Sequence, residues 1–526
     1  MSKAVNSSLK TAMKGTALVF AGMVGSQLLW FVTRLLIVKN LSKEDLGIYS
    51  LLVAIVSVIA PLATLGLWEG STRYISIFLG QGRTQDAVAV QRSSLWIGWI
   101  TGVGACAVMF LLSGVLAGYV FYKPELSVPL MVISFFIPAF VMSHILSAVV
   151  RGYGDIRPKV YFMDVGQPFL FLALLCFILL SRIPFITIIY AYVFSMLAMF
   201  VLIARYGYRK TGMIPFVCRE SGGHVGELLK FSVPVLSLDV MFLIFRWTDT
   251  LMLGRYGSAE EVGVYSVSVS LAAFLIFPLL ALDTVYMPVA GELFAKKRMT
   301  DLTRTYQVLT KWIFALTLPL FFILFFFPEM TITFLFGERF VNSALPLRIL
   351  SIGFLFDAFV GTNAVLLLVM GFSKAVMKVA VCGTALNIVL NYVLIKHVGL
   401  GMEGAALAST GSFLAIGLGY SFVLYRSSGI HLFTTGYLKP VIVSALIGAA
   451  IYAAAKSLPL YPWMLPVYFM LYICGYLASL ILTRSVDDED VFLFGEIMSR
   501  AGVAPETTRR IIARIYKRNE GKINAG

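Results

Sequence analysis

Apolar runs of about 20 residues recur along the whole sequence, and this pattern most narrows what the chain can fold into. Each run is long enough to cross a hydrocarbon layer of roughly 30 Å as a helix. Inside lipid the backbone must satisfy its own hydrogen bonds, and the alternation of barrel strands is absent, so we expect helices. With 59% hydrophobic and 13% charged residues, the composition excludes a water-soluble domain. The sequence therefore predicts an all-α polytopic membrane protein.

About fourteen transmembrane helices are expected from the apolar runs. The runs lie at 13–38, 46–79, 92–121, 127–151, 159–181, 184–206, 227–254, 262–294, 305–327, 344–371, 376–397, 402–425, 438–456 and 463–483. No Cys/His spacing typical of a metal site occurs, so we expect no bound metal and no cofactor.

Two short stretches occur twice. LSKEDLGIYS (41–50) reappears as GSAEEVGVYS (257–266), and RGYGDIRPKV (151–160) is echoed by MGFSKAVMKV (370–379). Both echoes are separated by nearly the same number of residues, so chance similarity of short loops is a poor explanation. We predict two pseudo-symmetric six-helix lobes plus two extra C-terminal helices. A central cavity between lobes related by an axis along the membrane normal would suit alternating access.

The repeat and the loop composition also predict the domain boundaries. The N-terminal six-helix lobe spans 1–206, and a basic, glycine-rich cytoplasmic linker spans 207–226. The C-terminal six-helix lobe follows at 227–430, helices 13 and 14 lie within 431–484, and a cytoplasmic amphipathic basic tail covers 485–526. The repeated glycines Gly152 and Gly371 are each expected to end a helix with a positive φ.

Lysine and arginine fall mainly on one side of the predicted helices. If both termini are cytoplasmic, about three quarters of the 42 Lys and Arg residues lie inside. The net charge of +15 then reflects topology and contact with anionic phospholipids at the cytoplasmic face, and it does not indicate nucleic-acid binding. We expect a multi-pass protein of the cytoplasmic membrane.

Charged side chains inside the apolar runs indicate a polar cavity, because a charge at mid-bilayer costs about 2.5–3.5 kcal/mol. Arg34 and Arg246 lie on equivalent helices of the two lobes, so both should face the cavity and grip a phosphate-bearing substrate. Alternatively, Arg246 only pairs with Asp249 and holds the lobes together. The predicted substrate-binding residues are Gln27, Trp30, Arg34, Arg246 and Asp249.

A second set of intramembrane charges could couple transport to Na⁺ or protons, or could act in gating. This set comprises Glu69, Arg73, Asp239, Asp283 and Asp357. The acidic residues could equally bond neighbouring helices, and the sequence does not separate these roles. His144 and Asp164 are interpreted as structural residues.

Four stretches resemble the polysaccharide-biosynthesis flippases of the O-antigen type. They are FVTRLLIVKNLSKEDLGIYSL, RWTDTLMLGRYGSAEEVGVYS, FGERFVNSALPLRILSIG and ALNIVLNYVLIKHVGLGMEGAALAST. The resemblance implies a fourteen-helix, two-lobe fold in the multidrug/oligosaccharidyl-lipid/polysaccharide exporter superfamily. It implies a flippase that moves polyprenyl-pyrophosphate-linked oligosaccharide from the inner to the outer leaflet. Arg34 matches the arginine of the family's first helix, and Asp249 matches its aspartate before the LG step.

Three alternatives remain open. A lipid II flippase or a drug/cation antiporter of the same superfamily would share the fold, although an antiporter would favour an acidic cavity over Arg34 and Arg246. A polyprenyl-dependent glycosyltransferase or polymerase would need catalytic carboxylates in a large outer loop, and the outer turns are short, so we expect no enzyme. A polysaccharide polymerase and glycosyltransferases are possible partners.

Overall fold

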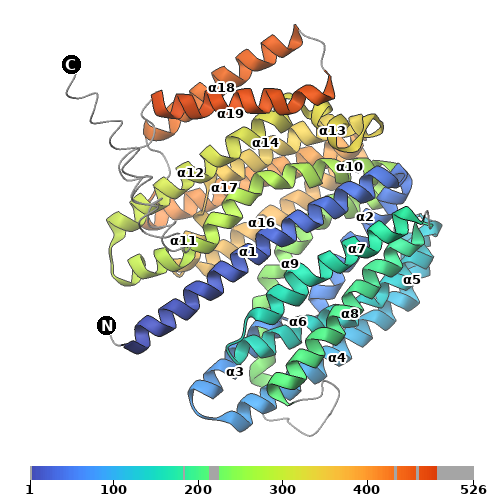
Figure 1. Ribbon diagram of the computed structural model, residues 1–526, viewed down its shortest axis with the longest axis vertical. Coiled ribbons are helices and arrows are strands. Elements are labelled where there is room, and N and C mark those ends of the chain that lie inside the picture. The colour runs from blue at the N-terminus through green and yellow to red at the C-terminus, as the bar shows by residue number, and fades with distance from the viewer. Residues whose placement is uncertain (1–2, 182–183, 213–223, 432–434, 458–460, 483–526) are drawn as a thin grey trace. The chain divides into compact units, whose positions relative to one another are not determined.

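The computed structural model describes residues 3–181, 184–212, 224–431, 435–457 and 461–482, which form helices and short turns (Figure 1). These residues include 13 helices long and apolar enough to cross a membrane, and a shorter apolar helix at Ile442–Ala455. The prediction of about fourteen membrane helices is thus confirmed. The tail at 485–526 and the linker residues 213–223 lie outside the described residues.

Contacts divide the chain into two compact units, which we describe separately. Unit 2 comprises Ala21–Val269 and Ala380–Ser412. Its helices are α1 (Lys3–Asn40), α2 (Lys43–Ala63), α3 (Leu67–Gly80), α4 (Thr84–Val115), α5 (Ser127–Ser134), α6 (Phe136–Gly152), α7 (Gln167–Leu180), α8 (Ile186–Thr211), α9 (Val225–Tyr256), and parts of α10 (Ala259–Ala272), α16 (Ser373–Asn391) and α17 (Gly401–Ser428). The shorter turns η1 (Leu116–Val120), η2 (Pro124–Leu126), η3 (Lys159–Gly166) and η6 (Tyr392–His397) connect or extend them.

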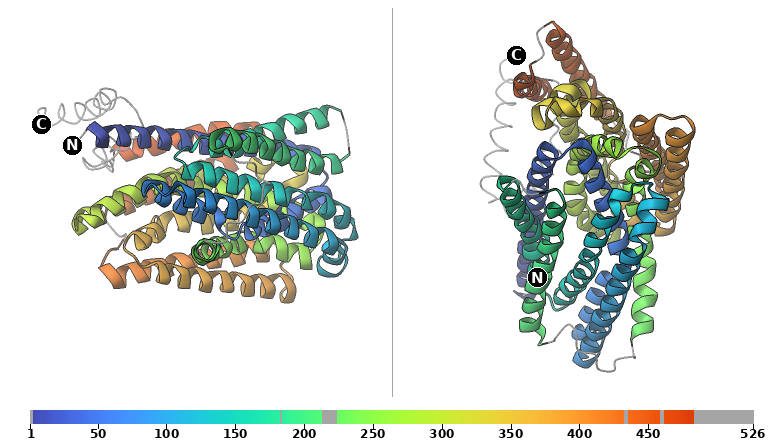
Figure 2. Two further views of the ribbon diagram at one scale, coloured as in Figure 1. Left: turned by 90° about the horizontal axis from the view of Figure 1, so that it is seen from below. Right: turned by 90° about the vertical axis from the view of Figure 1, so that its right-hand side faces the viewer.

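Unit 1 comprises Met1–Phe20, Ser270–Val379 and Phe413–Gly526. Its elements are η4 (Ala273–Ile276), α11 (Phe277–Ala295), α12 (Met299–Phe326), α13 (Pro328–Phe336), η5 (Glu338–Ser343), α14 (Ala344–Val360), α15 (Asn363–Val369), α18 (Thr435–Lys456), η7 (Pro462–Met464) and α19 (Leu465–Leu482), with the remaining parts of α1, α10, α16 and α17. Within each unit many helices run side by side, as Figure 2 shows. The predicted lobe boundaries stay a prediction.

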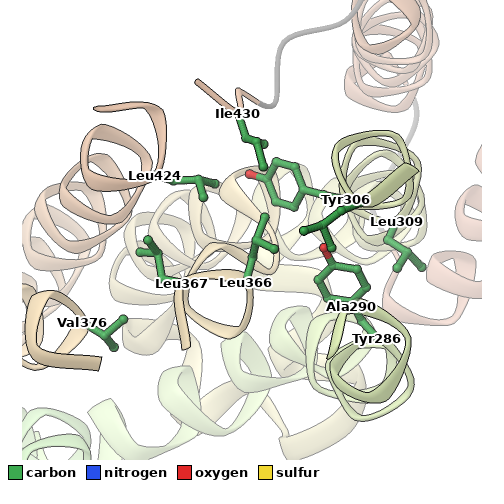
Figure 3. Close-up of a cluster of buried hydrophobic side chains, with 10 residues drawn as sticks. Tyr286, Ala290, Tyr306, Leu309, Leu366, Leu367, Val376, Leu424 and Ile430 are labelled. Carbon is green, nitrogen blue, oxygen red and sulfur yellow. The ribbon is translucent and has the colours of Figure 1, made fainter. Parts of the chain in front are cut away.

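Tyrosine and leucine side chains form the core of unit 1. Figure 3 shows this cluster, in which Tyr286 and Tyr306 are both fully buried among residues of α15 and α17. The C-terminal helix α19 is tied to α12 in the same unit. The Tyr472 ring stacks on Phe322 with centroids 3.9 Å apart, and the Tyr476 hydroxyl donates to the Ala315 carbonyl at 3.1 Å.

Polar side chains are buried in this fold while large apolar side chains are exposed. Ser71 and Ser94 are fully buried and share a hydrogen bond of 2.7 Å, whereas Leu111 is 76% and Leu180 85% exposed. Apolar exposure on this scale is costly in water but favourable in lipid. The outer surfaces of these helices therefore suit a hydrocarbon environment.

The close crossing of α2 and α10 inside unit 2 explains the repeated motif. A methyl group on Gly47 would lie 1.7 Å from the Ala259 carbonyl oxygen. A methyl group on Gly263 would lie 2.1 Å from the Lys43 carbonyl oxygen. The contact is reciprocal, because each glycine meets the first turn of the other copy, as a two-fold relation requires. The two copies are alike at their glycines because they pack against each other.

The predicted helix over 46–79 is broken between α2 and α3. Leu65 and Gly66 have φ angles of 51° and 69°, shortly after Pro61. A methyl group on Gly66 would lie 2.2 Å from the carbonyl oxygen of Ser232 on α9. Glycine is therefore required here both by the left-handed backbone and by the close approach of α9.

The expectation for the second pair of repeated glycines is confirmed at one member only. Gly371 has a φ of +87°, as expected for a helix C-terminus. Gly152 is the last residue of α6, but the expected positive φ is wrong there, since the φ of +86° belongs to Gly154. A methyl group on Gly152 would lie 2.8 Å from Cβ of Ile75, so this glycine serves the packing of α6 against α3.

Candidate functional site

A cavity of about 560 Å³ lies within unit 2. Its wall is formed by α1, α3, α6, η3, α7 and α8. The lining residues are Ser26, Trp30, Trp68, Glu69, Phe136, Phe140, His144, Ser147, Ala148, Arg151, Lys159, Phe162, Met163, Asp164, Gln167, Tyr192, Met196 and Met199. The volume is in the range that holds a small organic ligand.

Aromatic rings cover part of the cavity wall. Phe136 and Tyr192 are stacked with centroids 4.8 Å apart and an interplanar angle of 7°. The ring of Trp30 lies 6.2 Å from that of Tyr192. Further along α6, the rings of Phe140 and His144 are 4.0 Å apart. These side chains present a continuous aromatic surface, which favours flat or ring-shaped ligands with apolar faces.

Two ion pairs also line the cavity. Arg151 Nη2 is 3.1 Å from Glu69 Oε1, and Lys159 Nζ is 3.4 Å from Asp164 Oδ2. Arg151 Nε also donates to the Thr72 hydroxyl at 3.1 Å. Since each cation has a carboxylate partner, this part of the cavity carries both hydrogen-bond donors and acceptors without net charge.

The π-helical turn η3 explains the second ion pair. In η3 the backbone bonds join residues five apart, and Lys159 and Asp164 are separated by that interval. An α-helix would have turned these two side chains onto different faces. Such turns are frequent at functional sites, and this one brings both charges to the cavity.

The five predicted substrate-binding residues do not lie together in one site. Trp30 lines the cavity. Arg34 lies on α1 outside the lining and donates to the Ser50 hydroxyl at 3.4 and 3.5 Å. Gln27 and Arg246 are exposed, and the Arg246 guanidinium lies 5.9 Å from the ring of Trp247. Their roles in binding stay predictions.

Asp249 lies in a buried polar cluster of α9, α10, α16 and α17. Its carboxylate accepts hydrogen bonds from Tyr265 at 2.5 Å, from Ser409 at 2.6 Å and from Asn391 at 2.9 Å. Among the described residues, the side-chain carbonyl oxygens of Asn387 and Asn391 are buried without a hydrogen-bond donor. The cluster therefore holds one carboxylate and two unsatisfied oxygen atoms, which are groups that hard cations prefer.

The ion pair between Arg246 and Asp249 that we considered as an alternative does not occur among the described residues. All partners given above for the Asp249 carboxylate are neutral groups. Arg246 is therefore not neutralised by this aspartate, which leaves it available for another anion.

The residues predicted for coupling or gating do not form one group. Glu69 lines the cavity in its ion pair with Arg151. Arg73 points its guanidinium at the ring of Phe231 on α9, 4.2 Å from its centroid. Asp239 lies on α9, partly exposed. Both Asp283 and Asp357 lie in unit 1, and one oxygen of Asp283 is buried without a partner in the described residues.

Sequence reasoning missed three residues that the structure brings to notice. His144 and Asp164, interpreted as structural, both line the cavity. Lys123 is buried and donates to the Gly254 and Gly257 carbonyls at 2.7 and 2.9 Å, where it caps the C-terminus of α9. Burial lowers the pKa of Lys123. The only sequence signal for Lys123 was a lysine in a short outer loop, which is too common to be informative.

The pattern of a family described as "Polysaccharide biosynthesis protein" matches residues 12–294, more than half of the chain. The chain belongs to this family. A second family pattern, MatE, matches residues 235–393. The family members are transporters, so the polysaccharide-biosynthesis resemblance and the prediction of a non-enzymatic protein are confirmed.

Similar proteins confirm the fold. An "Uncharacterized membrane protein MJ1068" of Methanocaldococcus jannaschii is 23% identical over 406 residues, 72% of this chain and 77% of that protein. The lipid II flippase MurJ in an inward closed conformation matches with a TM-score of 0.70 and 14% identity, over 89% of this chain and 99% of that one. A MATE family transporter of the MOP superfamily, in an inward-facing conformation, matches with a TM-score of 0.68 and 18% identity, over 79% and 98%. This family member therefore has the fold of MOP-superfamily transporters.

Proposed function

We propose that the protein is a flippase for a polyprenyl-pyrophosphate-linked oligosaccharide. The substrate would move from the inner to the outer leaflet of the cytoplasmic membrane by alternating access. The observation that carries this proposal is the aromatic cavity with its two ion pairs, in a chain of the polysaccharide biosynthesis family. Such a wall suits a sugar better than a flat cationic drug, because its charges are balanced and its polar groups both donate and accept.

The proposal assigns the phosphate part of the substrate to arginine. Arg34 and Arg246 belong to α1 and α9, the helices that precede the two copies of the repeated motif. A guanidinium can hold a phosphate through two parallel hydrogen bonds, which a lysine cannot reproduce. The two arginines would thus bind the pyrophosphate while other surfaces hold the glycan.

The Asp249 cluster is the proposed coupling site. Asp249, Asn387 and Asn391 supply one carboxylate and two carbonyl oxygens that lack donors in the described chain. These residues would hold a monovalent cation such as Na⁺, whose binding free energy can drive an alternating-access cycle. A proton on Asp249 is the other coupling chemistry. Dependence on Na⁺ at fixed pH, or on pH at fixed Na⁺, separates the two.

The proposed substrate implies partner enzymes on both sides of the membrane and contacts with lipids. Glycosyltransferases on the inner side would supply the lipid-linked glycan, and a polymerase on the outer side would consume it. With both termini cytoplasmic, the basic loops would contact anionic phospholipids of the inner leaflet.

Reconstituted vesicles test the proposed function directly. Purified full-length protein is placed in liposomes with lipid-linked glycan extracted from the cells that make it, and a glycan-cleaving enzyme is added outside. We expect the cleaved fraction to rise from about half to nearly all of the glycan only when the protein is present. Transport of lipid II alone would identify a lipid II flippase, and extrusion of a cationic dye alone would identify an antiporter. Either result would reject the proposal.

A further inference from the structure

The cavity of unit 2 has two kinds of wall, and together they define a ligand class. Aromatic rings from α1, α6 and α8 form one wall, and the Arg151–Glu69 and Lys159–Asp164 pairs form another. The geometry points to a binding site for the neutral saccharide of the substrate, separate from the place where its pyrophosphate binds. This inference rests on the proposed function, since it assigns one part of the same substrate to one cavity.

The aromatic wall suits the apolar face of a sugar ring. Phe136 and Tyr192 lie nearly parallel at 4.8 Å, and Trp30 lies beside Tyr192 at 6.2 Å. An aromatic face is electron-rich, so it attracts the weakly positive C–H groups that cover one side of a pyranose ring. A prenyl chain would also pack on these rings, but it would leave the nearby ion pairs without polar contacts.

The charged wall excludes a phosphate and accepts hydroxyl groups. A pyrophosphate beside Arg151 and Lys159 would also stand beside the carboxylates of Glu69 and Asp164, which are 3.1 and 3.4 Å from those cations. The carboxylates repel it and cancel the attraction. A sugar hydroxyl both donates and accepts, so neighbouring hydroxyls can bind a carboxylate and its cation at once.

Two further observations fit a saccharide. The indole N–H of Trp68, whose ring borders the cavity, is buried without an acceptor among the described residues. Unsatisfied buried donors are rare, and a ligand oxygen is one way to satisfy this one. The cavity volume of about 560 Å³ suits a short saccharide, so the rest of the glycan and the prenyl tail would lie outside it.

The experiment measures affinity for two probes with the full-length protein in lipid nanodiscs. One probe is the polyprenyl-pyrophosphate glycan extracted from producing cells, and the other is polyprenyl pyrophosphate without glycan. For Trp30→Ala and Trp68→Ala we expect at least tenfold weaker binding of the glycan lipid and less than twofold change for the bare lipid. Trp30→Phe should recover most of the loss, because a ring face is needed there, whereas Trp68→Phe should recover only part of it, because it lacks the indole N–H. The matched control is Trp96→Ala, on α4 outside the cavity and 47% exposed, which should leave both affinities unchanged.

The variant Glu69→Gln gives a test of opposite sign. If the saccharide binds at the ion pairs, binding of the glycan lipid weakens and binding of the bare lipid stays the same. If the pyrophosphate binds there, removal of the negative charge strengthens binding of the bare lipid, by threefold or more, and the inference is overturned. Equal losses for both probes in the tryptophan variants, with unchanged thermal stability, would also overturn it. If only the saccharide site is wrong, the wild-type protein still flips the glycan lipid. If the proposed function is wrong, the wild-type protein does not flip it.

Discussion

Arg34 on α1 and Asp249 on α9 lie on the helices that precede the two copies of the duplicated motif, yet they carry opposite charges. Each follows a threonine whose hydroxyl donates to the carbonyl four residues earlier, at 2.8 Å for Thr33 and 2.6 Å for Thr248. The two helices therefore share the same local hydrogen bond one residue before the charged side chain.

The surroundings of the two charges differ as much as their signs. Each bonds one member of the Tyr-Ser pair of the following helix, Arg34 with Ser50 and Asp249 with Tyr265. The Arg34 bonds are 3.4 and 3.5 Å long, near the limit for a hydrogen bond, whereas those of Asp249 are 2.5 to 2.9 Å. Asp249 is thus fixed by three short hydrogen bonds, while the bonds from Arg34 to Ser50 are longer.

This difference suits the two charges to two roles, cation binding at Asp249 and anion binding at Arg34. A rigid carboxylate surrounded by donors and orphan carbonyl oxygens suits a small cation that must be bound with defined geometry. A guanidinium suits a large anion such as a phosphate, which it can hold through two parallel hydrogen bonds. The comparison predicts that changes at Asp249 affect stability and transport together, and that changes at Arg34 affect transport alone.

The largest effect is expected where the two copies meet. Gly47→Ala or Gly263→Ala places a methyl group within about 2 Å of a backbone carbonyl, so we expect a loss of at least about 3 kcal/mol and little protein in the membrane. Thermal unfolding in detergent and membrane abundance measure this. The control is Gly104→Ala on α4, which has no atom within 4 Å and should be neutral or slightly stabilising. Wild-type stability of the Gly47 variant would contradict the reciprocal crossing.

The next largest effect is expected at Asp249. Asp249→Asn removes the charge that three donors surround, so we expect a loss of about 2–3 kcal/mol together with about 100-fold slower flipping. If Na⁺ is the coupling ion, its stabilisation of the wild type against heat should disappear in this variant.

A matched pair on α17 controls the Asp249 experiment. Ser409→Ala removes a bond to Asp249 and should show a weaker form of the same defect, about 1–2 kcal/mol. Ser412→Ala removes only a bond to the Ala408 carbonyl on its own helix and should keep the Na⁺ response. Loss of the Na⁺ response in both serine variants would show that the response does not report on the Asp249 cluster.

At Arg34 we expect a large change in transport with a small change in stability. Arg34→Ala should insert normally, lose less than about 1 kcal/mol and flip at least about 100-fold more slowly, because it loses bidentate contact with phosphate. Arg34→Lys should recover part of the rate. Surface polysaccharide and flipping in vesicles are the measurements. Normal polysaccharide display by the alanine variant would remove Arg34 from the mechanism.

The smallest effect concerns an ion pair that exists in one copy only. Lys43 pairs with Glu260 at 2.8 Å, but the equivalent pair would join Ala259 to Glu44. Ala259→Lys should therefore add a second, exposed ion pair that stabilises by no more than about 1 kcal/mol at low salt. Thermal unfolding at two salt concentrations measures it, with Ala259→Met as the uncharged control. Equal shifts in both variants would show that the gain is not electrostatic.

The sequence by itself determined the membrane class, the number of helices and the duplication. These follow from local properties, because a run of about 20 apolar residues must form a helix in lipid whatever its neighbours are. The repeated glycine motif likewise predicted a two-fold relation before any contact was known. Of the predicted binding residues, Trp30 lines the cavity.

The tertiary structure alone decided which side chains meet. Asp249 obtains its partners Asn391 and Ser409 from 142 and 160 residues further along the chain, and no periodicity within α9 indicates them. Glu69 and Asp164 became cavity residues only because α3 and η3 face the same space, with a π-helical turn that sequence patterns did not reveal. Helix formation depends on nearby residues and on lipid, so it can be predicted from the sequence. A binding site depends on how distant helices pack, so its residues are known only from the tertiary structure.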